Sequence, residues 1–197
     1  TSTTSSSSDD PEDCSATRVF VPLCGKSVDM AYLTSMAEVV GVEGIKTALE
    51  EFQLEQPDLQ IELQPGIQNG FERFVGTKIT LLKGDFFELT TTDTNGSFDV
   101  IYDRASMVAI QPELRSSYVD VLGRLLSKGG KILLVVLDRR GTEEAKGPPF
   151  SIPEATVREF YEGLDWVESV TLIDDNGEKV ENQSTAMVSL YFLIQAK

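Results

Sequence analysis

The chain has 197 residues, 41% of them hydrophobic, which is enough for one domain with a sizeable core and too few for two ordinary domains. With 17 basic and 32 acidic residues and no histidine, its formal net charge is −15. Such an excess of negative charge repels nucleic-acid phosphates and anionic lipid, so we expect neither a nucleic-acid nor a membrane partner.

Apolar runs and cysteines set further limits. No stretch approaches the roughly 20 apolar residues of a transmembrane helix, and the start does not resemble a signal peptide. Cys14 lies in a polar segment and Cys24 in a glycine turn, and the two have neither the number nor the spacing of a disulfide framework or a metal site. We expect a soluble, cytoplasmic, monomeric protein without a bound metal.

The absence of histidine restricts the chemistry. It removes Ser-His and Cys-His nucleophilic schemes and the commonest general base. The remaining options need little proton transfer. This favours reactions in which a cofactor already carries an activated group, while the protein supplies orientation and electrostatics.

The chain begins with a low-complexity segment. Residues 1–15 are rich in serine and acidic side chains and poor in apolar ones, so they cannot bury enough surface to order themselves. We therefore predict a flexible tail over residues 1–15 and a single domain over residues 16–197.

The domain opens with a strand, a tight turn and a helix. The apolar run over 18–22 predicts a buried strand, the sequence PLCGKS a turn, and the following residues a helix over about 27–37. Gly25 allows a ligand to approach the backbone, and Ser27 can cap the helix. Doubly wound α/β proteins bind the phosphate or carboxylate of nucleotide-like ligands at such a turn. The three-glycine dinucleotide fingerprint is absent, which disfavours a nicotinamide or flavin ligand.

Alternating strands and helices follow along the chain. Two apolar runs near residue 75 are suited to pair as a hairpin, and the second of them also to join the main sheet. Repeated strand–helix units before a terminal β-ribbon predict a mostly parallel sheet with antiparallel strands at one edge. The predicted elements are strands over 38–42, 71–75, 78–82, 98–102, 131–137, 166–173 and 187–194, and helices over 44–55, 112–126 and 153–161.

Polar side chains follow three of the predicted strands. Glu43 ends the second strand, Asp85-Phe86 follows the run over 78–82, and Asp103-Arg104 follows the strand over 98–102. A carboxylate after the second strand commonly binds ribose hydroxyls, whereas a glutamate there is equally compatible with a structural role. Because the carboxyl ends of parallel strands meet at one edge, we expect these residues to share a ligand site.

Four segments carry a resemblance to a known family. RVFVPLCGKSVDM, VVGVE, FDVIYDRASMVAI and GPPFSIP, spread over residues 18–153, resemble the thiopurine S-methyltransferase family of S-adenosylmethionine-dependent class I methyltransferases. The resemblance implies a Rossmann-like α/β fold with a mostly parallel seven-stranded sheet and antiparallel C-terminal strands. It also implies S-adenosylmethionine as cofactor, with S-adenosylhomocysteine as its product.

The resemblance also implies where the cofactor binds. Leu23, Cys24 and Gly25 are expected to line its methionine end by backbone contact, and Glu43 to hold the ribose diol. Asp85 with Phe86 is expected to flank the adenine.

For the acceptor, the resemblance implies a small-molecule thiol bound beside Arg104. Arg104 matches an arginine that faces cofactor and substrate, where it can stabilise an anionic thiolate. Pro149 and Phe150, in the sequence GPPF, match a segment bordering the substrate pocket, although a rigid loop before a helix explains them equally well. Asp103 is expected to orient Arg104 or to serve as a structural cap.

These expectations add up to methyl transfer to the sulfur of small heteroaromatic thiols such as thiopurines. A sulfonium methyl is already electrophilic, so attack by a thiolate needs alignment and desolvation more than acid–base catalysis. Two alternatives stay open: methylation of halide, sulfide or metalloid nucleophiles, and a nonenzymatic S-adenosylmethionine-binding domain. The second follows from the serine-rich start of the chain, where family members carry an aromatic helical segment that closes over the site.

Overall fold

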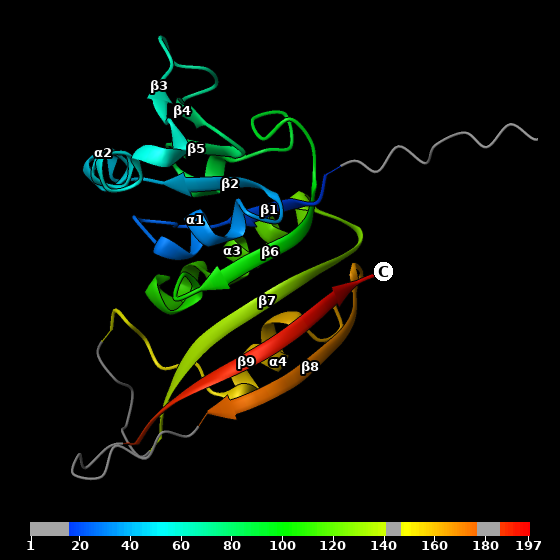
Figure 1. Ribbon diagram of the computed structural model, residues 1–197. Helices are drawn as coiled ribbons and strands as arrows, with labels where there is room; N and C mark the ends of the chain where they lie inside the picture. The colour runs from blue at the N-terminus through cyan, green and yellow to red at the C-terminus, as the bar shows by residue number, and fades with distance from the viewer. Residues whose placement is uncertain (1–15, 141–146, 177–185) are drawn as a thin grey trace, which may run out of the picture.

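One nine-stranded sheet organises the residues that the structure, a computed structural model, describes: 16–140, 147–176 and 186–197. The flexible tail predicted over residues 1–15 lies outside these ranges. The order of strands across the sheet is β3-β4-β5-β2-β1-β6-β7-β9-β8. Figure 1 shows β7, β9 and β8 side by side at one end of the sheet and the short strands β3 and β4 at the other.

Five strands run parallel at the centre, and four antiparallel strands flank them. The central strands are β1 (Arg18–Val21), β2 (Glu38–Glu43), β5 (Ile79–Lys83), β6 (Phe98–Arg104) and β7 (Leu126–Arg140). The flanking strands are β3 (Glu62–Leu63), β4 (Glu72–Gly76), β8 (Val167–Asn176) and β9 (Ala186–Ala196); each of them pairs antiparallel with every strand beside it.

The fold class expected from the sequence is confirmed, although the sheet has nine strands instead of seven. β4 corresponds to the strand predicted over 71–75, the first arm of the hairpin, whereas β3 was not predicted. β5 pairs antiparallel with β4 and parallel with β2. The second arm of the predicted hairpin therefore does join the main sheet.

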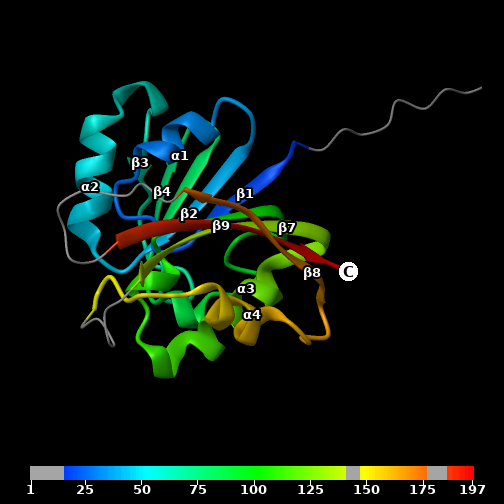
Figure 2. The ribbon, with the colours of Figure 1, turned by 90° about the horizontal axis from the view of Figure 1, so that it is seen from below.

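Helices cover both faces of the sheet. α1 (Val28–Leu33) and α2 (Lys46–Glu55) lie on one face, and α3 (Arg115–Leu125) and α4 (Glu154–Tyr161) on the other, as Figure 2 shows. Single turns of 3-10 helix complete the connections: η1 (Pro57–Leu59), η2 (Phe86–Glu88), η3 (Met107–Ala109) and η4 (Pro112–Leu114).

The hydrophobic core is divided by the sheet because successive strand side chains point to opposite faces. Val19 packs in the smaller cluster together with Leu49 and Phe52 of α2. Its neighbour Phe20 packs in the larger cluster, together with Tyr118 of α3. This alternation explains why Val19, Phe20 and Val21 are all apolar, as expected of a strand buried on both sides.

Two element boundaries differ from the prediction. The first helix ends at Leu33 because the hydroxyls of Thr34 and Ser35 donate to the carbonyls of Ala31 and Tyr32, both at 2.7 Å.

The second difference concerns Lys128-Gly129-Gly130, which precede the strand predicted over 131–137. These residues lie within β7, which begins at Leu126. The Ser127 hydroxyl donates to the Phe98 carbonyl at 2.5 Å and ties the start of β7 to β6.

No helix in the described ranges combines the length and the apolarity needed to cross a bilayer.

Candidate functional site

The turn after β1 is bound to the end of β2. The amide of Cys24 donates to the carbonyl of Val42 at 2.9 Å. Leu23 and Gly25 both have left-handed backbone, with φ of 42° and 51°, and nothing lies within 4 Å of where a Gly25 Cβ would be. Ser27 caps α1 as predicted, since its Oγ accepts from the amide of Asp29 at 3.3 Å. The turn therefore presents backbone to the edge of the sheet.

Cys24 points inward and serves packing. Its side chain is buried, and its Sγ occupies space that Gly41 leaves free: a Cβ on Gly41 would lie 2.8 Å from this sulfur. Burial, followed by the nearby Glu43 carboxylate, raises the pKa of the Cys24 thiol far above its usual value. The Cys24 side chain therefore belongs to the core and does not act as a thiolate.

Glu43 has its carboxylate fixed at the same edge. Its Oε2 accepts from the amide of Gly25 at 3.0 Å, and its Oε1 accepts from the amide of Ile45 at 2.8 Å. A carboxylate offers about four acceptor positions, so these two bonds orient the group while leaving capacity for two ligand hydroxyls.

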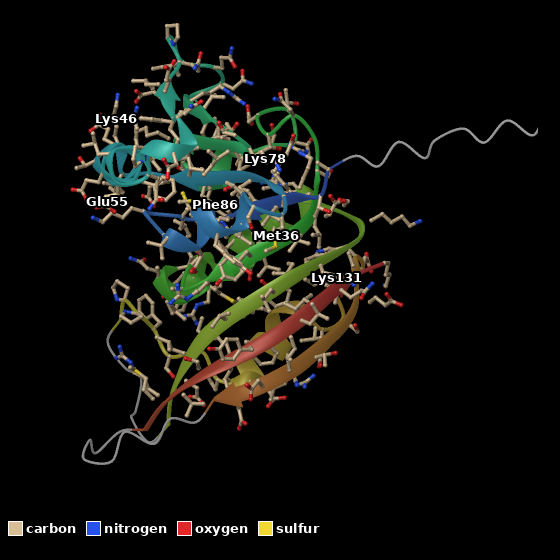
Figure 3. All side chains as sticks on the ribbon, viewed as in Figure 1. Met36, Lys46, Glu55, Lys78, Phe86 and Lys131 are labelled. Carbon is tan, nitrogen blue, oxygen red and sulfur yellow. The ribbon has the colours of Figure 1, made fainter. Side chains whose placement is uncertain are left out.

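A hollow of about 420 Å³, here called the Glu43 hollow, contains several of the predicted residues. Leu23, Glu43, Asp85 and Phe86 line it, together with Phe87, Gly44, Gly70, Gly84, Lys83 and Val42. It lies beyond the end of β5. In Figure 3, the labelled Lys78 precedes the opposite end of that strand, and Phe86 follows the end at the hollow.

Phe86 belongs mostly to the core. It is 4% exposed, and its ring stacks on Tyr118 at 4.8 Å and faces Phe20 at 6.4 Å between centroids. Phe87, which sequence reasoning did not single out, is half-buried and lines the same hollow. Asp85 is exposed, and its Oδ1 caps η2 by accepting from the Phe87 amide at 2.9 Å.

A second hollow, of about 600 Å³, contains Arg104 and is here called the Arg104 hollow. Leu23 lines both hollows and so lies between them. The walls of the second hollow come from the turn after β1, the end of β6, and the strands β7 and β9. They include Cys24, Lys26, Ser27, Ala105, Val135, Leu137, Ser189 and Tyr191.

Arg104 pairs with a residue that the sequence did not point to. Its Nη1 lies 2.7 Å from Oδ2 of Asp29 in α1, and the Tyr102 hydroxyl donates to the same oxygen at 3.1 Å. The Asp29 carboxylate raises the pKa of the Arg104 guanidinium. The pKa of Tyr102 is raised to about 12, first by burial and then by Asp29. An aspartate in the first turn of a helix is ordinary, because it favours the helix dipole, so the sequence carried no signal of this pairing.

Asp103 does not orient Arg104, which corrects one of its two predicted roles. Its carboxylate is fully buried on the other face of β6, where it accepts from the Tyr118 hydroxyl at 2.7 Å and the Met107 amide at 3.3 Å. The other predicted role, a structural cap, is confirmed by the bond to η3. Burial is the largest influence on Asp103 and raises the pKa of its carboxyl to about 6.

Pro149 and Phe150 line neither the Glu43 hollow nor the Arg104 hollow, as far as the described residues define them. The Phe150 amide donates to the Val108 carbonyl at 2.7 Å, and the Arg115 guanidinium lies 5.5 Å from the centroid of its ring. Phe150 therefore packs beside η3 and α3, so the structure supports its reading as part of a rigid loop.

A family model described as "Thiopurine S-methyltransferase (TPMT)" matches residues 7–192. The thiopurine S-methyltransferase of Aliivibrio salmonicida is 41% identical over 147 residues, covering 74% of this chain and 66% of that protein. That of Methylococcus capsulatus is 43% identical over 145 residues, covering 73% and 64%. The chain thus spans just under two thirds of the length of these relatives.

Comparison with solved structures gives the same fold. The 1,6-didemethyltoxoflavin-N1-methyltransferase of Burkholderia thailandensis, solved with S-adenosylhomocysteine, superposes with a TM-score of 0.62 at 14% identity, covering 92% of this chain and 72% of that one. The N-terminal domain of EvdMO1, also solved with S-adenosylhomocysteine, has a TM-score of 0.63 at 13% identity, covering 93% and 76%. The architecture is that of class I methyltransferases.

Proposed function

The chain belongs to the thiopurine S-methyltransferase family, and we propose that it transfers the methyl group of S-adenosylmethionine to the sulfur of small heteroaromatic thiols. The observation that carries this proposal is the fixed carboxylate of Glu43. It is held by the amides of Gly25 and Ile45 at the edge where β1, β2, β5 and β6 end. This is the edge at which α/β folds of this type bind nucleotide-like ligands.

The groups present fit S-adenosylmethionine. Glu43 is an acceptor for the ribose diol, and Asp85 and Phe87 line the same hollow on the side suited to an adenine. Leu23, whose backbone is left-handed like that of Gly25, lines both hollows, where the methionine end is expected. When bound, the cofactor supplies an electrophilic methyl group on a sulfonium.

The chain itself contributes positioning and electrostatics. Arg104 lies in the neighbouring hollow, and its guanidinium is a permanent cation that can donate hydrogen bonds to an anionic sulfur. Val135 and Leu137 provide apolar walls there, which suit a flat heteroaromatic acceptor and exclude water. No residue is required as a general base, because a thiol with a low pKa arrives ionised.

The experiment that tests this function has two stages. Calorimetric titration with S-adenosylhomocysteine is expected to show one site per chain. Incubation with 6-mercaptopurine and methyl-labelled S-adenosylmethionine is then expected to give the S-methyl product. Absence of binding contradicts the whole proposal, and binding without methyl transfer contradicts the catalytic part. Hydrogen sulfide and iodide, as parallel acceptors, test the specificity for aromatic thiols.

A further inference from the structure

Arg104, the cation assigned to the acceptor, already has a negative partner. We propose that Asp29 is a specificity-determining residue: it sets how much positive charge Arg104 presents to the acceptor, and so limits transfer to thiols that ionise readily. This inference rests on the proposed function, because it concerns the acceptor of the same site.

The pairing leaves most of the guanidinium available. Within the described ranges, Nη1 is the one Arg104 nitrogen with a hydrogen bond, to Oδ2 of Asp29 at 2.7 Å. The Arg104 side chain is 56% exposed and that of Asp29 is 28% exposed. Nε and Nη2 therefore remain free to bind an acceptor while Asp29 keeps its contact. A ligand does not need to displace Asp29, so the carboxylate stays beside the guanidinium during the reaction.

Local structure holds Asp29 in this position. It lies in the first turn of α1, whose start is fixed by the Ser27 cap, and its Oδ2 also accepts from the Tyr102 hydroxyl at 3.1 Å. Tyr102 lies on β6 two residues before Arg104, so both partners of the carboxylate belong to one strand. The distance between the two charges is thus set by backbone elements and not by flexible side chains alone.

Among the described residues that line the Arg104 hollow, one other carries a charge. Lys26 lines the same hollow, but Glu51 and Glu55 of α2 neutralise its ammonium at 2.9 and 2.7 Å. Tyr102 on β6 is uncharged near neutral pH, because burial raises the pKa of its hydroxyl to about 12, and the β7 residues that line the hollow are apolar. The field at the acceptor is therefore that of a nearly neutral Arg104–Asp29 pair, which favours ionisation of a bound thiol far less than an unpaired arginine would.

The test measures the ionisation of a bound acceptor directly. 6-Mercaptopurine is titrated by ultraviolet absorbance on protein saturated with S-adenosylhomocysteine, which prevents turnover. Asp29→Asn keeps the size of the side chain and an oxygen for Arg104 while removing the charge. We expect the titration midpoint of the bound thiol to fall by about one pH unit, and the acidic limb of kcat, which reports the bound complex, to move equally.

Further variants test whether the charge of Asp29 causes the shift in the titration midpoint. Arg104→Gln is expected to raise the midpoint, opposite to Asp29→Asn. Asp29→Glu, which keeps the charge, is expected to leave it near the wild-type value. Asp120→Asn, an exposed position on α3 with the same change in net charge, is the matched control and is expected to have no effect. If Asp29→Asn does not fold, Asp29→Ser removes the same charge.

The outcomes separate the two proposals. An Asp29→Asn midpoint equal to wild type, with S-adenosylhomocysteine still bound, overturns the role of Asp29 and leaves the proposed function intact. Failure of the wild-type chain to bind S-adenosylhomocysteine overturns the proposed function itself.

Discussion

Asp103 and Arg104 are neighbours on β6 with opposite surroundings. The Asp103 carboxylate is buried beneath α3 and bonded to Tyr118, whereas the Arg104 guanidinium lines the rim of the sheet and is bonded to Asp29. Successive side chains of a strand point to opposite faces, so Asp103 faces the core beneath α3 while Arg104 faces the hollow at the edge of the sheet. For these two residues, the face of the sheet to which the side chain points decides whether it packs in the core or lines the hollow.

Asp103 makes stability depend on pH. Its pKa of about 6 in the folded state exceeds the ordinary value of 3.8, so the folded state binds the proton more tightly than the unfolded state. Its contribution to the free energy of unfolding is complete below the ordinary pKa and is lost as pH rises through about 6. Relative to Asp103→Asn, wild-type stability is expected to fall by about 2 kcal/mol between pH 4 and pH 8. Urea unfolding at both pH values measures this difference.

The exposed Asp120→Asn variant provides the reference for that experiment, since it is expected to show no such pH-dependent difference. A stability difference between wild type and Asp103→Asn that stays constant over this pH range would argue against a buried, titrating carboxyl.

Glu43 is expected to determine cofactor affinity. Glu43→Gln removes a charged acceptor and turns an NH₂ group toward one of the two amides that now donate to the carboxylate. We expect S-adenosylhomocysteine to bind roughly 10- to 100-fold more weakly, since hydrogen bonds to charged groups contribute about 1.5–3 kcal/mol. Calorimetry measures the change. Glu38→Gln, at the exposed start of the same strand, is the matched control, and equal affinities of the two variants would contradict this role of Glu43.

At the scale of elements, Gly123 lets α3 pack closely against Trp166, the residue just before β8. A Cβ on Gly123 would lie 2.7 Å from both Cε2 and Nε1 of Trp166, the one tryptophan of the chain. Trp166 in turn meets Tyr161 of α4 edge to face, with ring centroids 6.2 Å apart. Gly123 therefore allows one indole to join two helices and the terminal ribbon.

Gly123→Ala tests this contact. Alanine in a helix is normally favoured over glycine by about 1 kcal/mol. Here the overlap with the indole is expected to outweigh that gain, giving a net loss of about 1 kcal/mol in the free energy of unfolding. The displaced Trp166 is expected to emit at longer wavelength. Ser117→Ala, at an exposed position on the same helix, is expected to change neither quantity appreciably. Unchanged or increased stability of Gly123→Ala would show that the Trp166 indole can move aside at little energetic cost.

At the scale of the whole molecule, the excess of acidic residues opposes compaction. A formal charge of −15 on 197 residues produces self-repulsion that added salt screens. We expect Tm to rise by a few degrees between low and physiological sodium chloride, as measured by calorimetry. Near the isoelectric point of about 4.3 the same salt is expected to have little effect. A Tm that falls with salt at neutral pH would mean that paired charges, such as those of Lys26 and Arg158, dominate instead.

Much of the fold follows from local pattern. The short run over 18–22 and the long one over 131–137 are strands because apolar residues fill both faces, and the long helices end within a few residues of their expected positions. β4 lies within one residue of the strand predicted over 71–75, whereas β3 was not predicted. β3 has two residues, both exposed, and its pairing with β4 depends on β4 already lying against β5. A strand this short depends on the strand that pairs with it, and it has no hydrophobic periodicity that the sequence could reveal.

Several residues of the candidate site could likewise be placed from the sequence. Leu23, Glu43, Asp85 and Arg104 lie at the expected edge because parallel strands end there together. Phe150 was placed beside them by resemblance, yet it packs against Arg115. Asp29 was missed because its distance to Arg104 depends on how α1 crosses the end of β6.

The sequence by itself thus determined the succession of strands and helices, the edge at which the candidate site residues lie, and the exclusion of histidine-based chemistry, since these depend on residue type and periodicity along the chain. Only the tertiary structure decided that Asp103 is buried, that Phe86 belongs largely to the core, and that Arg104 meets a carboxylate 75 positions earlier. Those facts depend on distances between separate elements, which are set by how the sheet and its helices pack together.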